Sequence, residues 1–290
     1  MQKEEKLKHL MSLSLPTPEE LREDSARRHA AAKAPFEAPG TGAFIGTSLR
    51  AWLDVMEAAG IPTIPAEAVV KLRRETFLGF EYSEVEEPEA WEQFGAAIAA
   101  IPDSHMARWD ACSSLDLKFA MAEKQPFGKH ARQLSTGDPR AFDILADYPA
   151  DEFTVWARPW VQAKMLDGYP VEFRVFVKDS QVLGVASYYP QRPLPDTPEM
   201  RGLAEQCVEL TRKALRHLEN TGQYPWLVNY ARHFAEGTVN ATLDFLVRPD
   251  NQVVFLEAGP PYGAGAHPCT FIDRPIEGVA LELAPGVVLR

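Results

Sequence analysis

An α+β fold is predicted by three parts of the sequence, namely two hairpins and the long amphipathic helix between them. An alternating strand over 171–177 and an apolar return strand over 182–189 indicate the first hairpin. Apolar residues recur at helical spacing over 198–219. The second hairpin spans 242–257, with Pro-Asp-Asn at its turn. We expect the helix to lie across the sheet that the hairpins form.

The rest of the chain carries shorter signals, which begin with a helix near the N-terminus. Thr17 and Glu20 have the spacing of a capping box, and this helix is expected to fade into a linker over 34–42. Apolar residues at helical spacing predict a second helix over 48–59, which Gly60 closes. Similar patterns predict a helix over 88–100 and strands over 68–72, 76–82, 105–109, 154–163 and 226–231.

Composition excludes several classes of function. The 290 residues suit one large domain or two modest ones, and no apolar run approaches the roughly 18 residues that a membrane span needs, so we expect no membrane partner. The net charge of -11 opposes general nucleic-acid binding, although a few cations can still hold a small phosphate ligand. A charged N-terminus and three widely spaced cysteines favour a cytoplasmic protein with reduced thiols.

Two carboxylates in the second hairpin are the first candidates for chemistry. Asp244 interrupts an apolar strand and Glu257 ends the returning one, so the turn can bring both acids into one neighbourhood. Mg²⁺ typically takes one or two protein carboxylates and completes its shell with phosphates and water. The alternative is a pair of ordinary surface acids. An unpaired carboxylate inside an apolar strand would be costly, which favours the metal site.

Three arginines inside apolar strands are the candidate cations: Arg108, Arg158 and Arg174. A guanidinium in such a place needs an anionic partner, and its planar fork matches phosphate or carboxylate. Internal salt bridges are the alternative for each arginine taken alone. Three arginines together favour a polyanion as the ligand.

Two lysines and a histidine are weaker candidates for the same site. Lys118 and Lys164 follow apolar residues, although a lone lysine is more often a solvated surface residue. His267 lies in a Gly-rich segment from which it could act on substrate, and an incidental histidine is the alternative. The nearby Gly-Ala-Gly does not precede a capped helix, so we do not interpret it as a phosphate-binding loop.

Four stretches of the sequence resemble the ATP-grasp superfamily, at 153–161, 172–179, 243–247 and 255–257. The first is similar to the strand and hinge that lead to the adenine pocket, and the last two match the positions of the metal-binding acids. The second is similar to the most recognisable motif of one branch. That branch contains the cell-division-cycle-type assembly chaperones of initiation factors and related bacterial and phage ATP-grasp ligases, and the chain resembles it most. Together these stretches cover roughly residues 105–262.

The resemblance implies an ATP-grasp fold, in which two α+β subdomains with antiparallel sheets clasp a nucleotide. The nucleotide-binding region would span 105–290, after a helical arm at 1–41 and a substrate region at 42–104. ATP and Mg²⁺ are the implied cofactors. The implied reaction is ligation of a carboxylate substrate to an amine acceptor through an acylphosphate, with peptides or proteins among the candidate substrates.

The resemblance also assigns roles by position. Arg158 and Arg174 would be catalytic, in contact with phosphates or the substrate carboxylate, and Asp244 with Glu257 would hold the metal. Arg108 lies where the superfamily often has a lysine. The residues assigned to nucleotide binding are Arg108, Lys118, Arg158, Trp160, Val161 and Arg174.

The sequence departs from the superfamily at the expected third metal ligand. An asparagine usually stands two residues after the glutamate, and Gly259 stands there in this chain, with Asn240 as a possible substitute ligand. The first hypothesis is an ATP- and Mg²⁺-dependent carboxylate-amine ligase. The alternative is an ATP-binding assembly factor for a protein partner, without ligation, and a structural protein with incidental acids is a third hypothesis.

Overall fold

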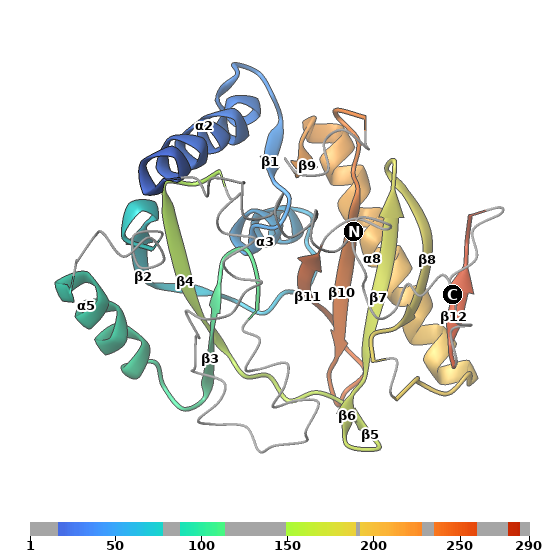
Figure 1. The fold of residues 1–290 in the computed structure, drawn as a ribbon. Helices are drawn as coiled ribbons and strands as arrows, with labels where there is room; N and C mark the ends of the chain where they lie inside the picture. Colours follow the sequence, from blue (N-terminus) through green and yellow to red (C-terminus); the bar gives the residue numbers. More distant parts are fainter. Residues whose placement is uncertain are drawn as a thin grey trace, which may run out of the picture.

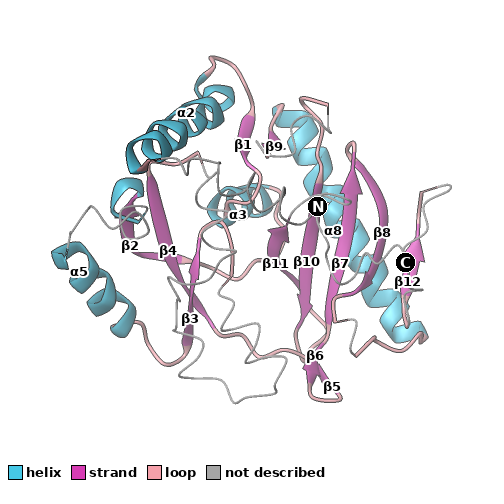
Figure 2. Cartoon of the chain, in the orientation of Figure 1, coloured by secondary structure: helices cyan, strands magenta, loops and turns pink. Residues whose placement is uncertain are grey.

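Two antiparallel sheets with separate cores make up most of the computed structural model, which describes residues 17–77, 88–113, 149–189, 192–227, 235–259 and 278–284 (Figures 1 and 2). In the described residues, one sheet has five strands in the order β11-β10-β7-β8-β12. The other has three strands in the order β2-β4-β3. The predicted α+β class is confirmed.

The five-stranded sheet contains both predicted hairpins. Its strands are β7 (Glu172–Lys178), β8 (Gln181–Ser187), β10 (Ala241–Val247), β11 (Val253–Gly259) and β12 (Ala280–Glu282). The β7–β8 turn has positive φ at both central residues, 48° at Asp179 and 61° at Ser180. This is the turn geometry that matches the twist of a hairpin. The turn places β7 between β8 and β10.

Two helices, α3 (Leu49–Ala58) and α8 (Pro198–Thr221), share one apolar core with this sheet. Figure 1 shows α8 running across the sheet, as the sequence predicts. Thr197 caps α8, and Gly222 ends it with a φ of 65°. Strand residues of alternating position, such as Val175, pack into this core. Because side chains alternate across a strand, their neighbours face away from α8.

The three-stranded sheet is built from β2 (Glu67–Arg73), β3 (His105–Trp109) and β4 (Glu152–Pro159), and α5 (Pro88–Ala99) packs on it. Its core is rich in aromatic rings, with Phe94 stacked on Trp109 at 5.6 Å between ring centroids. The sheet joins strands from both sides of residue 104. A domain boundary at that residue stays a prediction.

The N-terminal helix is longer than the sequence predicts. The capping box of Thr17 and Glu20 is present, and α2 runs from Pro18 to Glu37. A linker that begins at residue 34 is therefore wrong, because the helix includes Pro35 and ends at Glu37. His29 and Lys33 bind the Asp151 carboxylate at 2.9 and 2.8 Å, which ties the helix to the chain just before β4.

Three predicted strands differ in the structure, either in their bounds or in their conformation. Residues 74–77 are helical, because Phe77 turns into the aromatic core against Trp109, and 78–82 lie outside the described residues. The strand predicted over 154–163 ends at Pro159, which has no N–H to donate. In place of the strand at 226–231, β9 (Tyr224–Trp226) pairs in parallel with β1 (Ala43–Ile45), and 228–231 lie outside the described residues.

The remaining described elements form a short hairpin, β5 (Met165–Leu166) and β6 (Tyr169–Pro170). Its turn has positive φ at Asp167 and Gly168. No helix among the described residues has the length and apolar character needed to cross a membrane.

The shared core of α3, α8 and the five-stranded sheet should dominate stability. Leu218 is fully buried in it, so Leu218→Ala is expected to lower the free energy of unfolding by about 2–5 kcal/mol. The matched control is Leu283→Ala, at a side chain that is 40% exposed, with a loss of about 0.5 kcal/mol. Chemical denaturation measures both variants, and equal losses would contradict this description of the core.

Candidate functional site

A row of charged side chains crosses three neighbouring strands of the five-stranded sheet. Glu257 on β11 is in register with Asp244 on β10, and Asp244 is in register with Arg174 on β7. These positions alternate with core residues such as Leu243 and Val175, so the row lies on the face opposite α8. The turn at 249–251 therefore brings Asp244 and Glu257 together, as the sequence predicts.

Arg174 and Asp244 form a buried, forked ion pair. Arg174 Nε donates to Asp244 Oδ1 at 2.6 Å and Nη2 donates to Oδ2 at 2.5 Å. The side chains are 3% and 0% exposed. The guanidinium carbon also lies 4.8 Å from the centre of the Tyr188 ring. The internal salt bridge, which was the alternative to a phosphate contact for this arginine, is present in the structure.

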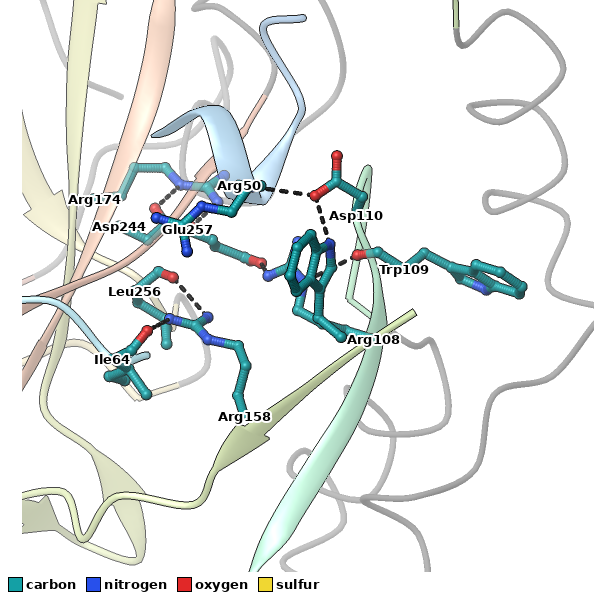
Figure 3. Close-up of polar contacts among 11 residues, drawn as sticks. Arg50, Ile64, Arg108, Trp109, Asp110, Arg158, Arg174, Asp244, Leu256 and Glu257 are labelled. Carbon is teal, nitrogen blue, oxygen red and sulfur yellow. Dashed lines mark hydrogen bonds and ion pairs between the residues drawn. The ribbon is translucent and has the colours of Figure 1, made fainter. Parts of the chain in front are cut away.

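A second ion pair joins the two sheets. Arg108 on β3 donates through Nη1 to Glu257 Oε2 at 2.6 Å and through Nε to the main-chain oxygen of Trp109 at 3.1 Å. Figure 3 shows Arg108 and Glu257 reaching toward each other from the small and the large sheet. The Glu257 side chain is 14% exposed, so it is the more accessible of the two candidate metal ligands.

Arg158 on β4 holds two main-chain oxygens and pairs with no carboxylate among the described residues. Its Nη1 donates to Leu256 at 2.8 Å and its Nη2 to Ile64 at 3.0 Å, while Nε is buried without a partner there. Burial and the nearby Arg108 charge lower the pKa of Arg158 to about 9. The guanidinium therefore remains protonated at neutral pH. Its positive charge is the one in this group that no acid offsets by direct contact.

Glu172 is a buried acid on the same face of β7 as Arg174. Tyr189 donates its hydroxyl hydrogen to Glu172 Oε2 at 3.2 Å. Burial, followed by the charges of Asp244 and Glu257, raises the pKa of Glu172 well above its ordinary value. Its surroundings therefore favour the neutral form of this carboxyl more strongly than water does.

Asp110 is a part of this region that sequence reasoning missed. Its Oδ1 accepts hydrogen bonds from Trp156 Nε1 at 2.7 Å and from the main-chain N–H of Arg50 at 3.1 Å, at the start of α3 (Figure 3). The signal was present in the sequence, because Asp110 is an acid that directly follows β3 and comes two residues after Arg108. It links β3 to α3 beside the ion pairs.

The other predicted site residues do not belong to the charged row. Val161 packs with the buried Ile64, Leu246 and Val254, an apolar cluster whose Leu246 lies two residues beyond Asp244 on β10. The main-chain N–H of Trp160 donates to the main-chain oxygen of Ser104 at 2.8 Å. The two remaining residues, Lys118 and His267, lie outside the described residues.

Lys164 and Asn240 have partners elsewhere. Lys164 Nζ contacts Glu199, and it donates to Asn251 Oδ1 at 2.7 Å. The Asn240 side chain accepts from the main-chain N–H of Asp179 at 2.9 Å, at the β7–β8 turn. These contacts place both residues in structural roles.

The donor set fits a divalent cation only in a limited way. No group of three or more His, Cys, Asp or Glu residues suitable for a metal occurs in the part of the chain that the structure describes. Asp244 and Glu257 are two neighbouring oxygen donors, and each carboxylate oxygen can accept more than one interaction. Two carboxylates suit Mg²⁺ whose other ligands are phosphates and water.

Comparisons with families and with curated proteins give no match. A scan against protein-family models finds none, and a search of the curated proteins finds none.

Solved structures do match, at low identity. Cdc123 from Schizosaccharomyces pombe is 14% identical with a TM-score of 0.44, over 73% of this chain and 82% of that one. The macrocyclase MdnC from Microcystis aeruginosa, bound to the precursor peptide MdnA, is 14% identical with a TM-score of 0.37, over 85% and 65%. D-alanine-D-alanine ligase from Coxiella burnetii is 12% identical with a TM-score of 0.35, over 74% and 48%. All three belong to the ATP-grasp superfamily, which the sequence motifs resemble.

The buried ion pair between Arg174 and Asp244 should affect the free energy of unfolding even without a ligand. Asp244→Asn is expected to lower the free energy of unfolding by about 3–5 kcal/mol, because Arg174 then stays buried without its counter-charge. The double variant Asp244→Asn/Arg174→Met should recover much of the loss, since both charges are removed. Chemical denaturation compares the two variants. A double variant no more stable than the single variant would contradict the account.

Glu172 should impose a pH dependence on stability. Because its pKa is raised in the folded protein, the folded state binds a proton that the unfolded state releases from about pH 4.3 upward. The wild type should therefore lose stability relative to Glu172→Gln as the pH rises from that value to the folded pKa. Denaturation midpoints of both proteins from pH 4 to pH 9 measure the difference. A difference that does not change with pH would exclude a raised pKa.

Proposed function

We propose that the region between the two sheets binds Mg²⁺-ATP, and that the chain is an ATP-dependent carboxylate-amine ligase. The observation that carries the proposal is Arg158, which is 1% exposed and pairs with no carboxylate among the described residues. A buried charge without a counter-ion costs several kcal/mol, so an anionic ligand beside it would be strongly favoured. Its Nε–H, which has no hydrogen-bond partner among the described residues, would supply a donor for that ligand.

A nucleotide suits the surroundings of Arg158 because they combine charged and apolar parts. Arg158 donates to the main chain of Ile64 and Leu256, and Ile64 belongs to the apolar cluster with Val161 and Leu246. Glu257, the residue after Leu256, belongs to the charged row. The phosphates of the nucleotide would lie toward the charged row, and its base would lie toward the apolar cluster. The base would then lie beside Val161, a residue that the resemblance assigns to nucleotide binding.

Asp244 and Glu257 would hold Mg²⁺, which when bound offsets part of the phosphate charge. Before ligand binds, hydrogen bonds from Arg174 and Arg108 hold these two acids in place. The raised pKa of Glu172 favours the neutral form of this neighbouring acid. The two carboxylates would thus bind Mg²⁺, and Arg158 would bind a phosphate.

Ligation would proceed in two transfers that need little covalent chemistry from the protein. The substrate carboxylate attacks the γ-phosphorus, which forms an acylphosphate and releases ADP. The amine then attacks the acyl carbon and expels phosphate as the C–N bond forms, with loss of its proton. Arg158 and Arg174 are the cations that would stabilise the charge on the transferring group. Peptides or proteins are the proposed substrates, in the cytoplasm.

An ATP-binding assembly factor is the second candidate, because two of the three arginines are committed to internal ion pairs. Arg108 and Arg174 each hold a carboxylate of this chain, and Gly259 stands where the resemblance implies a third metal ligand. A site of this kind could bind nucleotide to fix the relative position of the two sheets for a protein partner. It would then show little turnover.

Release of ADP separates the two candidates. Purified protein is incubated with Mg²⁺, ATP and a panel of peptides with free carboxylates, with and without hydroxylamine as the amine. A ligase should release ADP only with a carboxylate present, and should convert that carboxylate to a hydroxamate when hydroxylamine is added. Binding of ATP without such release would support the assembly factor. Absence of ATP binding would contradict both.

The role of Arg158 has its own variant. Arg158→Met is expected to weaken ATP binding about ten- to a hundredfold, because charge-assisted hydrogen bonds of about 1.5–3 kcal/mol are lost. Arg212→Met is the matched control, since Arg212 is exposed on α8 and pairs with Glu209. Calorimetric titration measures both, and circular dichroism checks that Arg158→Met is folded. Equal affinities for a folded Arg158→Met and the wild type would remove Arg158 from the site.

A further inference from the structure

Gly259 lies on the charged face of β11, two residues after Glu257, and its surroundings leave no room for a side chain. A Cβ built at Gly259 would lie 2.7 Å from Thr242 Oγ1, closer than real Cβ atoms approach other atoms. Thr242 is buried on β10 and in register with Gly259, so it cannot swing away into solvent. This position therefore cannot supply a third ligand to a cation held by Asp244 and Glu257.

The guanidinium of Arg174 lies beside Gly259 instead. The same Cβ position is 3.8 Å from Arg174 Nη2, the nitrogen that donates to Asp244 Oδ2 at 2.5 Å. Both oxygens of Asp244 are engaged by this guanidinium, and neither side chain has access to solvent. Of the two acids, Glu257 is the one that solvent reaches.

We propose that the site takes one divalent cation per nucleotide, and that the Arg174 guanidinium occupies the place of a second one. This inference rests on the proposed nucleotide site. The fork on Asp244 supplies a fixed positive charge beside the phosphates, and Gly259 provides the room for it. Asp244 and Glu257 then share a single metal ion, whose remaining ligands come from phosphate and water.

The test counts cations and nucleotides in the same samples. Wild-type protein is dialysed to equilibrium against Mn²⁺ and a non-hydrolysable ATP analogue, with free Mn²⁺ followed by electron paramagnetic resonance and the analogue by its absorbance. Arg174→Met removes the guanidinium and so vacates the place that a second cation would take. Arg212→Met, which removes an exposed arginine from its pair with Glu209, is the control.

One Mn²⁺ per bound nucleotide is expected for the wild type and for Arg212→Met, and two are expected for Arg174→Met. Two Mn²⁺ per nucleotide in the wild type would overturn the inference and leave the proposed function standing. One Mn²⁺ in a folded Arg174→Met would overturn the role given to the guanidinium. If Arg174→Met does not fold, the number of Mn²⁺ ions per nucleotide in the wild type alone tests the inference. Protein that binds no nucleotide would overturn both the inference and the proposed function.

Discussion

The forked ion pair between Arg174 and Asp244 is the interaction on which the site depends. It sits on the two central strands β7 and β10, in register and closed to solvent, so both side chains are held by the sheet itself. A pair of this kind stabilises little relative to an apolar core, but losing one partner is expensive. Replacing either residue alone would therefore destabilise the sheet, so the acid and the cation stay together on the face opposite α8.

The other two arginines extend this arrangement to the second sheet. Arg108 reaches from β3 to Glu257, and Arg158 reaches from β4 to the main chain of Leu256, so the same short stretch of β11 receives both. The two contacts differ in one respect. Arg108 meets a carboxylate, whereas among the described residues Arg158 donates to carbonyl oxygens alone, which do not neutralise its charge. Arg158 is thus the arginine of this junction whose charge no carboxylate contacts among the described residues.

The sequence predicted those parts of the fold that short-range patterns control. Both hairpins and α8 followed from periodicity and turn residues, and the embedded charges of Asp244 and Arg174 indicated a shared site. Pairing between sheets could not be predicted, because the contact of Arg108 with Glu257 spans 149 residues of chain. The helical conformation at 74–77 was missed because tertiary packing of Phe77 overrides local strand preference.

The most direct test of the central claim is a crystal structure of the protein with Mg²⁺ and a non-hydrolysable ATP analogue. The account predicts the phosphates between the two sheets, with Arg158 Nε within hydrogen-bond distance of a phosphate oxygen and the metal bound to Glu257 and Asp244. A nucleotide bound elsewhere, or an Arg158 that contacts only Leu256 and Ile64 in a nucleotide-loaded crystal, would contradict it.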